Sequence, residues 1–206
     1  MKKQLLSFML TLCLVMSLVP ATALAEENGQ ESKTVITAVD ELLQFAKDVN
    51  AGKYDNRTNA VVSLEADLDL TGVEWTPIGC TNDEGDVEHY FSGKFYGNGH
   101  SISNIDYASM YGKEDIGGLF GFLGGGAEIS GLTLKGNIDD AGEGYVFLGT
   151  LAGYTDGAKI SDCISEVVFN NHDKYINGTF GLCGYAENTV IEYCQNKGNI
   201  TITNDV

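Results

Sequence analysis

The segment from Gly117 to Leu134 reads GGLFGFLGGGAEISGLTL, and the chain repeats a version of its central part four times. The copies are FYGNGHSISNI from Phe95, FLGGGAEISGL from Phe122, YTDGAKISDC from Tyr154 and YAENTVIEYC from Tyr185. Each has an aromatic residue, a turn and then an isoleucine. Aligned in this way, the isoleucines form one column: Ile102, Ile129, Ile160 and Ile191. Repeats of roughly 20 to 50 residues bury their apolar faces only by stacking, so the column predicts a stacked core.

Other residues recur at the same offsets and predict about three short strands in each coil. Asn188 occupies the position in its copy that Gly157 occupies in the copy before. Glycine and asparagine both tolerate the left-handed backbone conformation, so this exchange predicts a turn there. Gly136–Ile138 and Gly198–Ile200 both read GNI and indicate a second corner. A further column pairs a leucine with a glycine two places on: Leu119 and Gly121, Leu151 and Gly153, Leu182 and Gly184. The fold class predicted is all-β, a parallel β-helix (solenoid) of about four coils.

The first 25 residues are typical of a cleaved secretory signal. Lys2 and Lys3 precede an apolar run from Leu5 to Val19, and Ala23 to Ala25 form a small-residue cleavage site. The apolar run is too short to span a membrane comfortably. We therefore predict export, no membrane insertion after cleavage, and a flexible polar leader over residues 26–33.

Residues 34–60 are predicted to form an N-terminal cap that contains one amphipathic helix at about 38–50. Apolar residues recur there at helical spacing: Val39, Leu42, Leu43, Ala46 and Val49. Thr37 and Asp40 resemble a capping box, and Gly52 stands where the helix is expected to stop. A helix before a stack of strands is well placed to cover its open end.

The β-helix is predicted over residues 61–206, beginning with a strand from Val61 to Leu70. Apolar and polar residues alternate there, which is typical of a strand with one buried face. Asp67 and Asp69 share the exposed face. One interpretation is that the two carboxylates form a catalytic or calcium-binding pair. The favoured interpretation is that they are ordinary solvated carboxylates, because no third ligand follows at a useful spacing.

An acidic insertion follows from Cys80 to Tyr90, reading CTNDEGDVEHY. Its acidic residues do not match the ligand positions of a calcium loop: Asp83, Glu84, Asp86 and Glu88. A solvated loop is the first interpretation. A weak cation site stays open as the second.

The formal net charge of −17 at pH 7 excludes two classes of partner. Such an acidic surface repels nucleic-acid phosphates and anionic membranes, and signal cleavage removes two further lysines. No phosphate-binding glycine motif or Cys/His metal spacing occurs, so no cofactor or metal is predicted.

The mature chain has four cysteines: Cys80, Cys163, Cys183 and Cys194. Cys163 and Cys194 occupy equivalent repeat positions, and neighbouring strands lie about 4.8 Å apart, within the range that a disulfide tolerates. A disulfide and a pair of small buried thiols both stay open, and the thiol pair is favoured. After the predicted strand Ile200 to Thr203, an open C-terminal β edge is expected either to continue into more coils or to meet a partner.

Several segments resemble bacterial surface proteins with GLUG-type repeats: VNAGKYDN, LEADLDLTGVEWTPIG, FSGKFYGNGHSISNI, IGGLFG, GTLAGY and FGLCGY. The resemblance extends over Thr34 to Thr203, although Thr150 replaces one glycine and Cys183 fills a variable position. It implies a right-handed parallel β-helix like that of filamentous adhesins, with display at the cell surface or secretion. It implies no catalytic residues.

The function predicted is therefore a non-catalytic module for adhesion or binding, with an extracellular glycan or a matrix protein as the partner. Four tyrosines are candidates for stacking on sugar rings, although half-buried structural tyrosines are the favoured interpretation: Tyr90, Tyr96, Tyr107 and Tyr111. A polysaccharide-active enzyme is the alternative, because parallel β-helices also carry lyases and hydrolases. Arg57 is the single arginine, which disfavours a lyase, whereas a hydrolase needs only carboxylates. A structural spacer is the third possibility.

Overall fold

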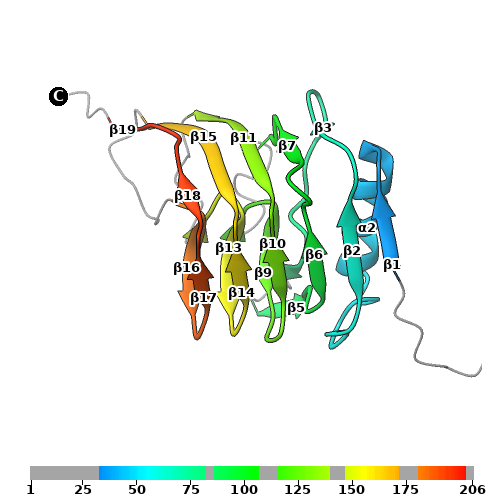
Figure 1. The fold of residues 1–206 in the computed structure, drawn as a ribbon. Helices are drawn as coiled ribbons and strands as arrows, with labels where there is room; N and C mark the ends of the chain where they lie inside the picture. Colours follow the sequence, from blue (N-terminus) through cyan, green and yellow to red (C-terminus); the bar gives the residue numbers. More distant parts are fainter. Residues whose placement is uncertain (1–32, 82–85, 107–115, 140–146, 172–180, 203–206) are drawn as a thin grey trace, which may run out of the picture. The chain divides into compact units, whose positions relative to one another are not determined.

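Short strands pair in parallel from one coil to the next through most of the structure (Figure 1). The computed structural model describes residues 33–81, 86–106, 116–139, 147–171 and 181–202, which all belong to one unit of the chain, Glu31–Val206. Within this unit the predicted parallel β-solenoid of about four turns is confirmed, with one short helix near the N-terminal end. The predicted signal segment and residues 26–32 lie outside the described residues.

Three parallel sheets form the sides of the coils. The first contains β1 (Lys33–Ile36), β2 (Val61–Leu64), β6 (Lys94–Tyr96), β10 (Glu128–Ser130), β14 (Lys159–Ser161) and β17 (Val190–Glu192). The second contains β3 (Leu68–Asp69), β7 (Ser101–Ser103), β11 (Thr133–Asp139), β15 (Ile164–Asn171) and β18 (Gln195–Asn196), and β19 (Ile200–Ile202) also pairs with β15. The third contains β9 (Phe120–Leu123), β13 (Ala152–Asp156) and β16 (Cys183–Glu187). A short parallel pair joins β8 (Ile116–Gly117) to β12 (Phe147–Leu148).

The core column runs through the first sheet. Ile129 pairs with Ile160, and Ile160 pairs with Ile191, as the repeats predict. Ile129 and Ile160 are both fully buried. Each such side chain contributes roughly 1.5–3 kcal/mol through the area that it removes from water.

The predicted position of Ile102 in this column is wrong. The residue that pairs with Ile129 from the preceding coil is Phe95, and Ile102 lies in the second sheet, paired with Leu134. The reason is that an aromatic residue followed by a glycine-rich turn occurs at two different corners. In the first copy this turn joins β6 to β7, whereas in the second it joins β9 to β10.

The predicted turn at Gly157 and Asn188 is confirmed. Gly126, Gly157 and Asn188 have φ values of +89°, +72° and +47° and follow one another from coil to coil. The amide of Gly126 donates to the carbonyl of Gly157 at 3.2 Å. The corner predicted at Gly136–Ile138 is not observed, because β11 continues through these residues. Ile138 and Ile200 nevertheless both pair with Phe169 of β15, from the coils on either side of it.

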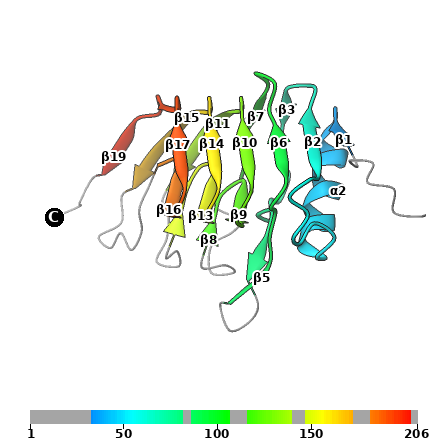
Figure 2. The same cartoon turned by 60° about the horizontal axis from the view of Figure 1, so that its bottom comes forward.

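The helix α2 runs from Val39 to Asn50 and lies beside β1 and β2 at the N-terminal end of the stack (Figures 1 and 2). Phe45 contacts the rings of Phe91 and Phe95 at centroid distances of 5.4 and 6.1 Å, so the helix covers the end of the core. In the described ranges no helix has the length and apolar character needed to cross a membrane.

The predicted stop of the helix at Gly52 is confirmed, whereas the capping box predicted at its N-terminal end is formed by other residues. Gly52 has a φ of +75° and its amide donates to the carbonyl of Val49 at 2.8 Å. The predicted cap by Asp40 is wrong. Glu41 closes the end instead, because its Oε2 accepts from the amide of Thr37 at 2.6 Å and from the amide of Ala38 at 3.2 Å. Ala38 is the N-cap residue, which places Glu41 at the third helical position.

The predicted single strand from Val61 to Leu70 is two strands, β2 and β3, separated by a corner at residues 65–67. The alternation holds from Leu64 onward, since Leu64, Leu68 and Leu70 are buried while Glu65, Asp67 and Asp69 are exposed. It fails at Ser63, which the pattern places on the exposed face and which is buried. A period of two therefore indicates which residues face the core but does not locate the corner. The strand predicted from Ile200 to Thr203 is observed as β19, and Thr203 lies outside the described residues.

Candidate functional site

A ladder of three aromatic rings follows the third sheet. Phe122, Tyr154 and Tyr185 occupy equivalent positions on β9, β13 and β16. The ring centroids of Phe122 and Tyr154 are 5.2 Å apart with an interplanar angle of 14°, and those of Tyr154 and Tyr185 are 5.0 Å apart at 19°. We call these three residues the aromatic ladder.

The local sequence explains why the rings lie at the surface. The next residues along the strands, Leu123 and Thr155, are fully buried, so the rings before them face away from the core. The glycine column lies beside the ladder and allows the coils to approach closely. A Cβ atom on Gly121 would lie 2.4 Å from the carbonyl oxygen of Gly79, so only glycine fits there.

Two further rings border the ladder. Tyr90 meets the edge of Phe122 with centroids 5.9 Å apart at 71°. Phe147 contacts Tyr154 at 5.9 Å and Tyr185 at 5.1 Å. Each aromatic pair stabilises the stack by about 0.5–1.5 kcal/mol beyond area burial. The ladder therefore has a structural role along most of its length.

A ligand ring can stack only where a ladder ring has an uncovered face. The faces of Tyr154 are covered by Phe122 and Tyr185, since both neighbours are stacked on it. Tyr185 is the last ring of the ladder and is 43% exposed. The end of the ladder at Tyr185 is thus the part that is chemically available for stacking.

Polar groups lie next to this end of the ladder. The hydroxyl of Tyr154 donates to Oε2 of Glu187 at 2.8 Å, and Nδ2 of Asn188 donates to Oδ1 of Asp156 at 3.0 Å. The hydrogen bond to Glu187 raises the pKa of Tyr154 to about 12, with smaller contributions from burial and nearby charges. Tyr154 therefore stays protonated at neutral pH, and the remaining carboxylate and amide groups can bind hydroxyl groups.

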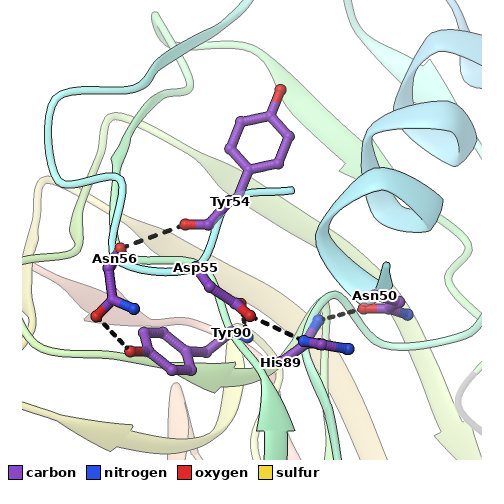
Figure 3. Close-up of polar contacts among 8 residues, drawn as sticks. Asn50, Tyr54, Asp55, Asn56, His89 and Tyr90 are labelled. Carbon is purple, nitrogen blue, oxygen red and sulfur yellow. Dashed lines mark hydrogen bonds and ion pairs between the residues drawn. The ribbon is translucent and has the colours of Figure 1, made fainter. Parts of the chain in front are cut away.

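The base of the acidic insertion is held by a polar cluster (Figure 3). Nδ1 of His89 lies 2.9 Å from Oδ2 of Asp55, whose Oδ1 accepts from the amide of Tyr90 at 3.2 Å. The hydroxyl of Tyr90 donates to Oδ1 of Asn56 at 2.9 Å. These contacts fix Tyr90 against Phe122 and explain how an insertion is joined to the regular coil.

The described part of the insertion forms an antiparallel pair of β4 (Cys80–Thr81) and β5 (Val87–His89). Asp86 and Glu88 are exposed, while Asp83 and Glu84 lie outside the described residues. Over the described ranges, no group of three or more His, Cys, Asp or Glu side chains is arranged to hold a metal ion. The predicted alternative of a weak cation site in this insertion stays a prediction.

Asp67 and Asp69 support backbone corners. Oδ1 of Asp67 accepts from the amide of Ser101 at 2.7 Å, and Oδ1 of Asp69 accepts from the amide of Thr71 at 3.0 Å and from Nδ2 of Asn104 at 2.9 Å. The hydrogen bonds from Ser101 lower the pKa of Asp67, and those from Thr71 and Asn104 lower the pKa of Asp69. Both carboxylates therefore stay ionised well below neutral pH.

Of the four tyrosines predicted as candidates, the two that the structure describes lie in different places. Tyr90 borders the ladder, Tyr96 lies in the first sheet between Ser63 and Ser130, and Tyr107 and Tyr111 lie outside the described residues. Sequence reasoning missed Tyr154 and Tyr185 as a surface pair. Both begin a repeat copy at the same offset, which is a signal of stacking but does not show that the rings face away from the core.

Comparison of the chain with models of protein families, with curated proteins and with solved structures found no match.

Proposed function

We propose that this chain is an exported, non-catalytic module that binds an extracellular glycan through the end of the aromatic ladder. The observation that carries the proposal is the exposed ring of Tyr185, which lies two and three residues before the polar residues Glu187 and Asn188. A sugar presents an apolar C–H face and several hydroxyl groups. An aromatic face beside carboxylate and amide groups is complementary to both.

The rigid sheet favours binding over a purely structural role for this surface. Tyr185 is fixed by the pairing of β16 with β13 and by the stacked ring of Tyr154. A ring that is already ordered loses little conformational entropy when a ligand binds. Loops are often the sites of recognition, but here the candidate surface belongs to the scaffold itself.

Export and surface display are part of the proposal. They are supported by the signal-like residues 1–25 and by the resemblance to GLUG-type surface proteins. The net charge of −17 also favours a neutral or basic ligand over an anionic one.

A polysaccharide hydrolase is the less favoured alternative. Glycoside hydrolysis requires a carboxylic acid whose pKa is raised, so that it can protonate the leaving group. Asp67 and Asp69 have the opposite shift, because hydrogen bonds stabilise their ionised forms. This pair is therefore poorly suited to general acid catalysis.

A screen of the purified chain against glycans and matrix proteins, with release of reducing sugar measured in parallel, tests the proposal. We expect glycan binding that Tyr185→Ala weakens at least about tenfold, which corresponds to about 1.4 kcal/mol. Tyr193→Ala is the matched control, because Tyr193 is 79% exposed but lies outside the ladder.

Three results would contradict the proposal. Binding only to a matrix protein would identify the wrong partner class, and binding to neither class would favour a spacer. Sugar release would favour an enzyme, and its persistence in the variant with Asp67→Asn and Asp69→Asn would place the catalytic groups elsewhere.

A further inference from the structure

Three thiols gather in the last two described coils. Cys163 lies just before β15 and is 1% exposed, Cys194 lies just before β18, and Cys183 is the first residue of β16. Sγ of Cys163 lies 3.3 Å from the carbonyl oxygen of Ser161, and Sγ of Cys194 lies 3.4 Å from that of Glu192. The two thiols thus have equivalent surroundings one coil apart.

The strand register places Cys163 and Cys194 side by side. Ile164 pairs in parallel with Gln195, and the amide of Gln195 donates to the carbonyl of Cys163 at 2.9 Å. Adjacent strands are separated by about 4.8 Å, which lies within the Cα separation of about 4.4–6.8 Å found for disulfides. Sγ of Cys194 also lies 3.8 Å from the carbonyl oxygen of Ile160, in the coil that contains Cys163.

Cys183 has no equivalent partner in the preceding coil. Its neighbour across the sheet is Ala152 on β13. Cys183 belongs to the third sheet, whereas Cys163 and Cys194 directly precede strands of the second sheet. A Cys183–Cys194 disulfide is therefore the alternative against which the Cys163–Cys194 bond can be tested.

The coil that contains Cys194 is the one that gains most from a cross-link. Ile160 is fully buried, whereas its partner Ile191 is 44% exposed. Phe169 is 3% exposed, whereas its partner Ile200 is 49% exposed. Because these side chains bury less apolar area than their partners, we expect this coil to be held more weakly than the described coils before it.

We propose that Cys163 and Cys194 form a disulfide in the exported protein and that this bond fastens the last described coil to its neighbour. Cys194 is the more exposed of the two and attacks a small-molecule disulfide such as oxidised glutathione. The first step joins Cys194 to one glutathione and releases the other as a thiol. Cys163 then attacks the Cys194 sulfur, its proton is released, and the second glutathione thiol leaves. The protein loses two electrons and two protons, and one oxidised glutathione becomes two reduced molecules.

The environment makes this reaction slow at neutral pH. Burial raises the pKa of the Cys163 thiol to about 12, and it raises the pKa of Cys183 to the same value. Burial also raises the pKa of Cys194, where the contacts with Cys163 oppose the effect. Since the thiolate is the attacking species, the rate of cross-linking is expected to rise with pH.

The test is to incubate the purified, reduced full chain with a glutathione redox buffer and to map disulfides by mass spectrometry without reduction. We expect an intramolecular peptide pair containing Cys163 and Cys194, and a Tm higher by roughly 4 °C or more than that of the reduced chain. Cys183→Ser should keep the cross-link and the Tm difference. Cys163→Ser and Cys194→Ser should lose both, and Cys163→Ala provides a second variant if the serine is not tolerated in the core.

A predominant Cys183–Cys194 bond, a disulfide between two molecules, or two thiols that stay reduced would each overturn the proposal. Its occurrence in the cell rests on the export proposed above, and comparison of exported chain with chain retained in a reducing cytoplasm tests that part separately. Disulfide mapping uses no glycan, so the chain can fail to bind a glycan without affecting the test of the disulfide.

Discussion

Ile160 is the residue on which the stacked core depends most directly. It is fully buried between Ile129 and Ile191, with one partner in each neighbouring coil. A side chain in this position stabilises three coils at once. The column is therefore the place where a single substitution should affect the whole repeat array.

We predict that Ile160→Asp lowers the free energy of unfolding by about 4 kcal/mol or more, because it buries a carboxyl group without a partner. Thermal unfolding followed by circular dichroism measures the effect. Val190→Asp is the matched control, since Val190 is 53% exposed in the next strand of the same sheet and should change stability by only about 0.5 kcal/mol. A melting temperature for Ile160→Asp equal to that of the original chain would disprove the role of the column.

Asn188 illustrates how one side chain can satisfy a backbone requirement that glycine meets elsewhere. Its φ of +47° matches the turn of Gly157, and its Nδ2 bonds to Asp156 at 3.0 Å. Asparagine is among the few residues with a side chain that adopt this conformation readily.

We expect Asn188→Ala to lower the free energy of unfolding by about 1–2 kcal/mol, because alanine is strained at this φ value. Asn188→Gly loses the same side-chain hydrogen bond but relieves the strain, so it should be more stable than the alanine variant. Chemical denaturation of the three proteins separates the two contributions. Equal stability of the alanine and glycine variants would show that the turn has no conformational requirement.

The helix α2 is an element whose position depends on its first turn. Glu41 accepts hydrogen bonds from the backbone of Thr37 and Ala38 and thus joins β1 to the helix. The amide of Thr37 makes the largest contribution to lowering the pKa of Glu41 from its usual 4.5. The folded-state pKa lies below the unfolded-state value, so this stabilisation is present above pH 4.5 and is lost as the pH falls through the folded-state pKa.

We predict that Glu41→Gln lowers the Tm by about 2–4 °C at pH 7. The difference from the original chain should shrink as the pH falls below 4.5, where protonation removes the charge from Glu41. Asp40→Asn is the matched control. Asp40 is also an acidic residue in the first turn, near the positive end of the helix dipole, but it is not the residue that forms the capping box. A Tm difference that is constant from pH 7 to pH 3 would argue against the ionised cap.

The described unit as a whole is a linear stack, in which each coil contacts chiefly its neighbours. The helix covers one end, with Phe45 against Phe91 and Phe95. At the other end, Val190, Ile191 and Ile200 are exposed. Stability is therefore expected to decrease along the stack toward Ile200.

Hydrogen exchange of the reduced chain, measured by mass spectrometry, tests this gradient. Backbone amides of β17 and β18 should exchange faster than those of β10 and β14, because the last coil opens without the others. The proposed Cys163–Cys194 cross-link should reduce the difference. Uniform protection along the stack would show instead that the coils unfold as one cooperative unit.

The repeat pattern alone determined the fold class and much of the register. Equivalent positions such as Ile160 and Ile191, or Gly157 and Asn188, are aligned in the sequence because the same backbone environment recurs in each coil. The helix and its glycine stop were also predictable, since 3.6-residue periodicity and positive φ are local properties. Export and family membership stay predictions from sequence.

Only the tertiary structure decided which corner each glycine-rich turn occupies. The turn after Phe95 and the turn after Phe122 look alike in sequence, yet the first follows β6 and the second follows β9. The backbone pairing of Phe95 with Ile129 resolves this, because register is set by hydrogen bonds between coils that the local pattern does not contain. The repeats already align Tyr154 with Tyr185 and Cys163 with Cys194. Only the placed coils show that the two tyrosine rings are stacked, because ring orientation depends on packing between coils.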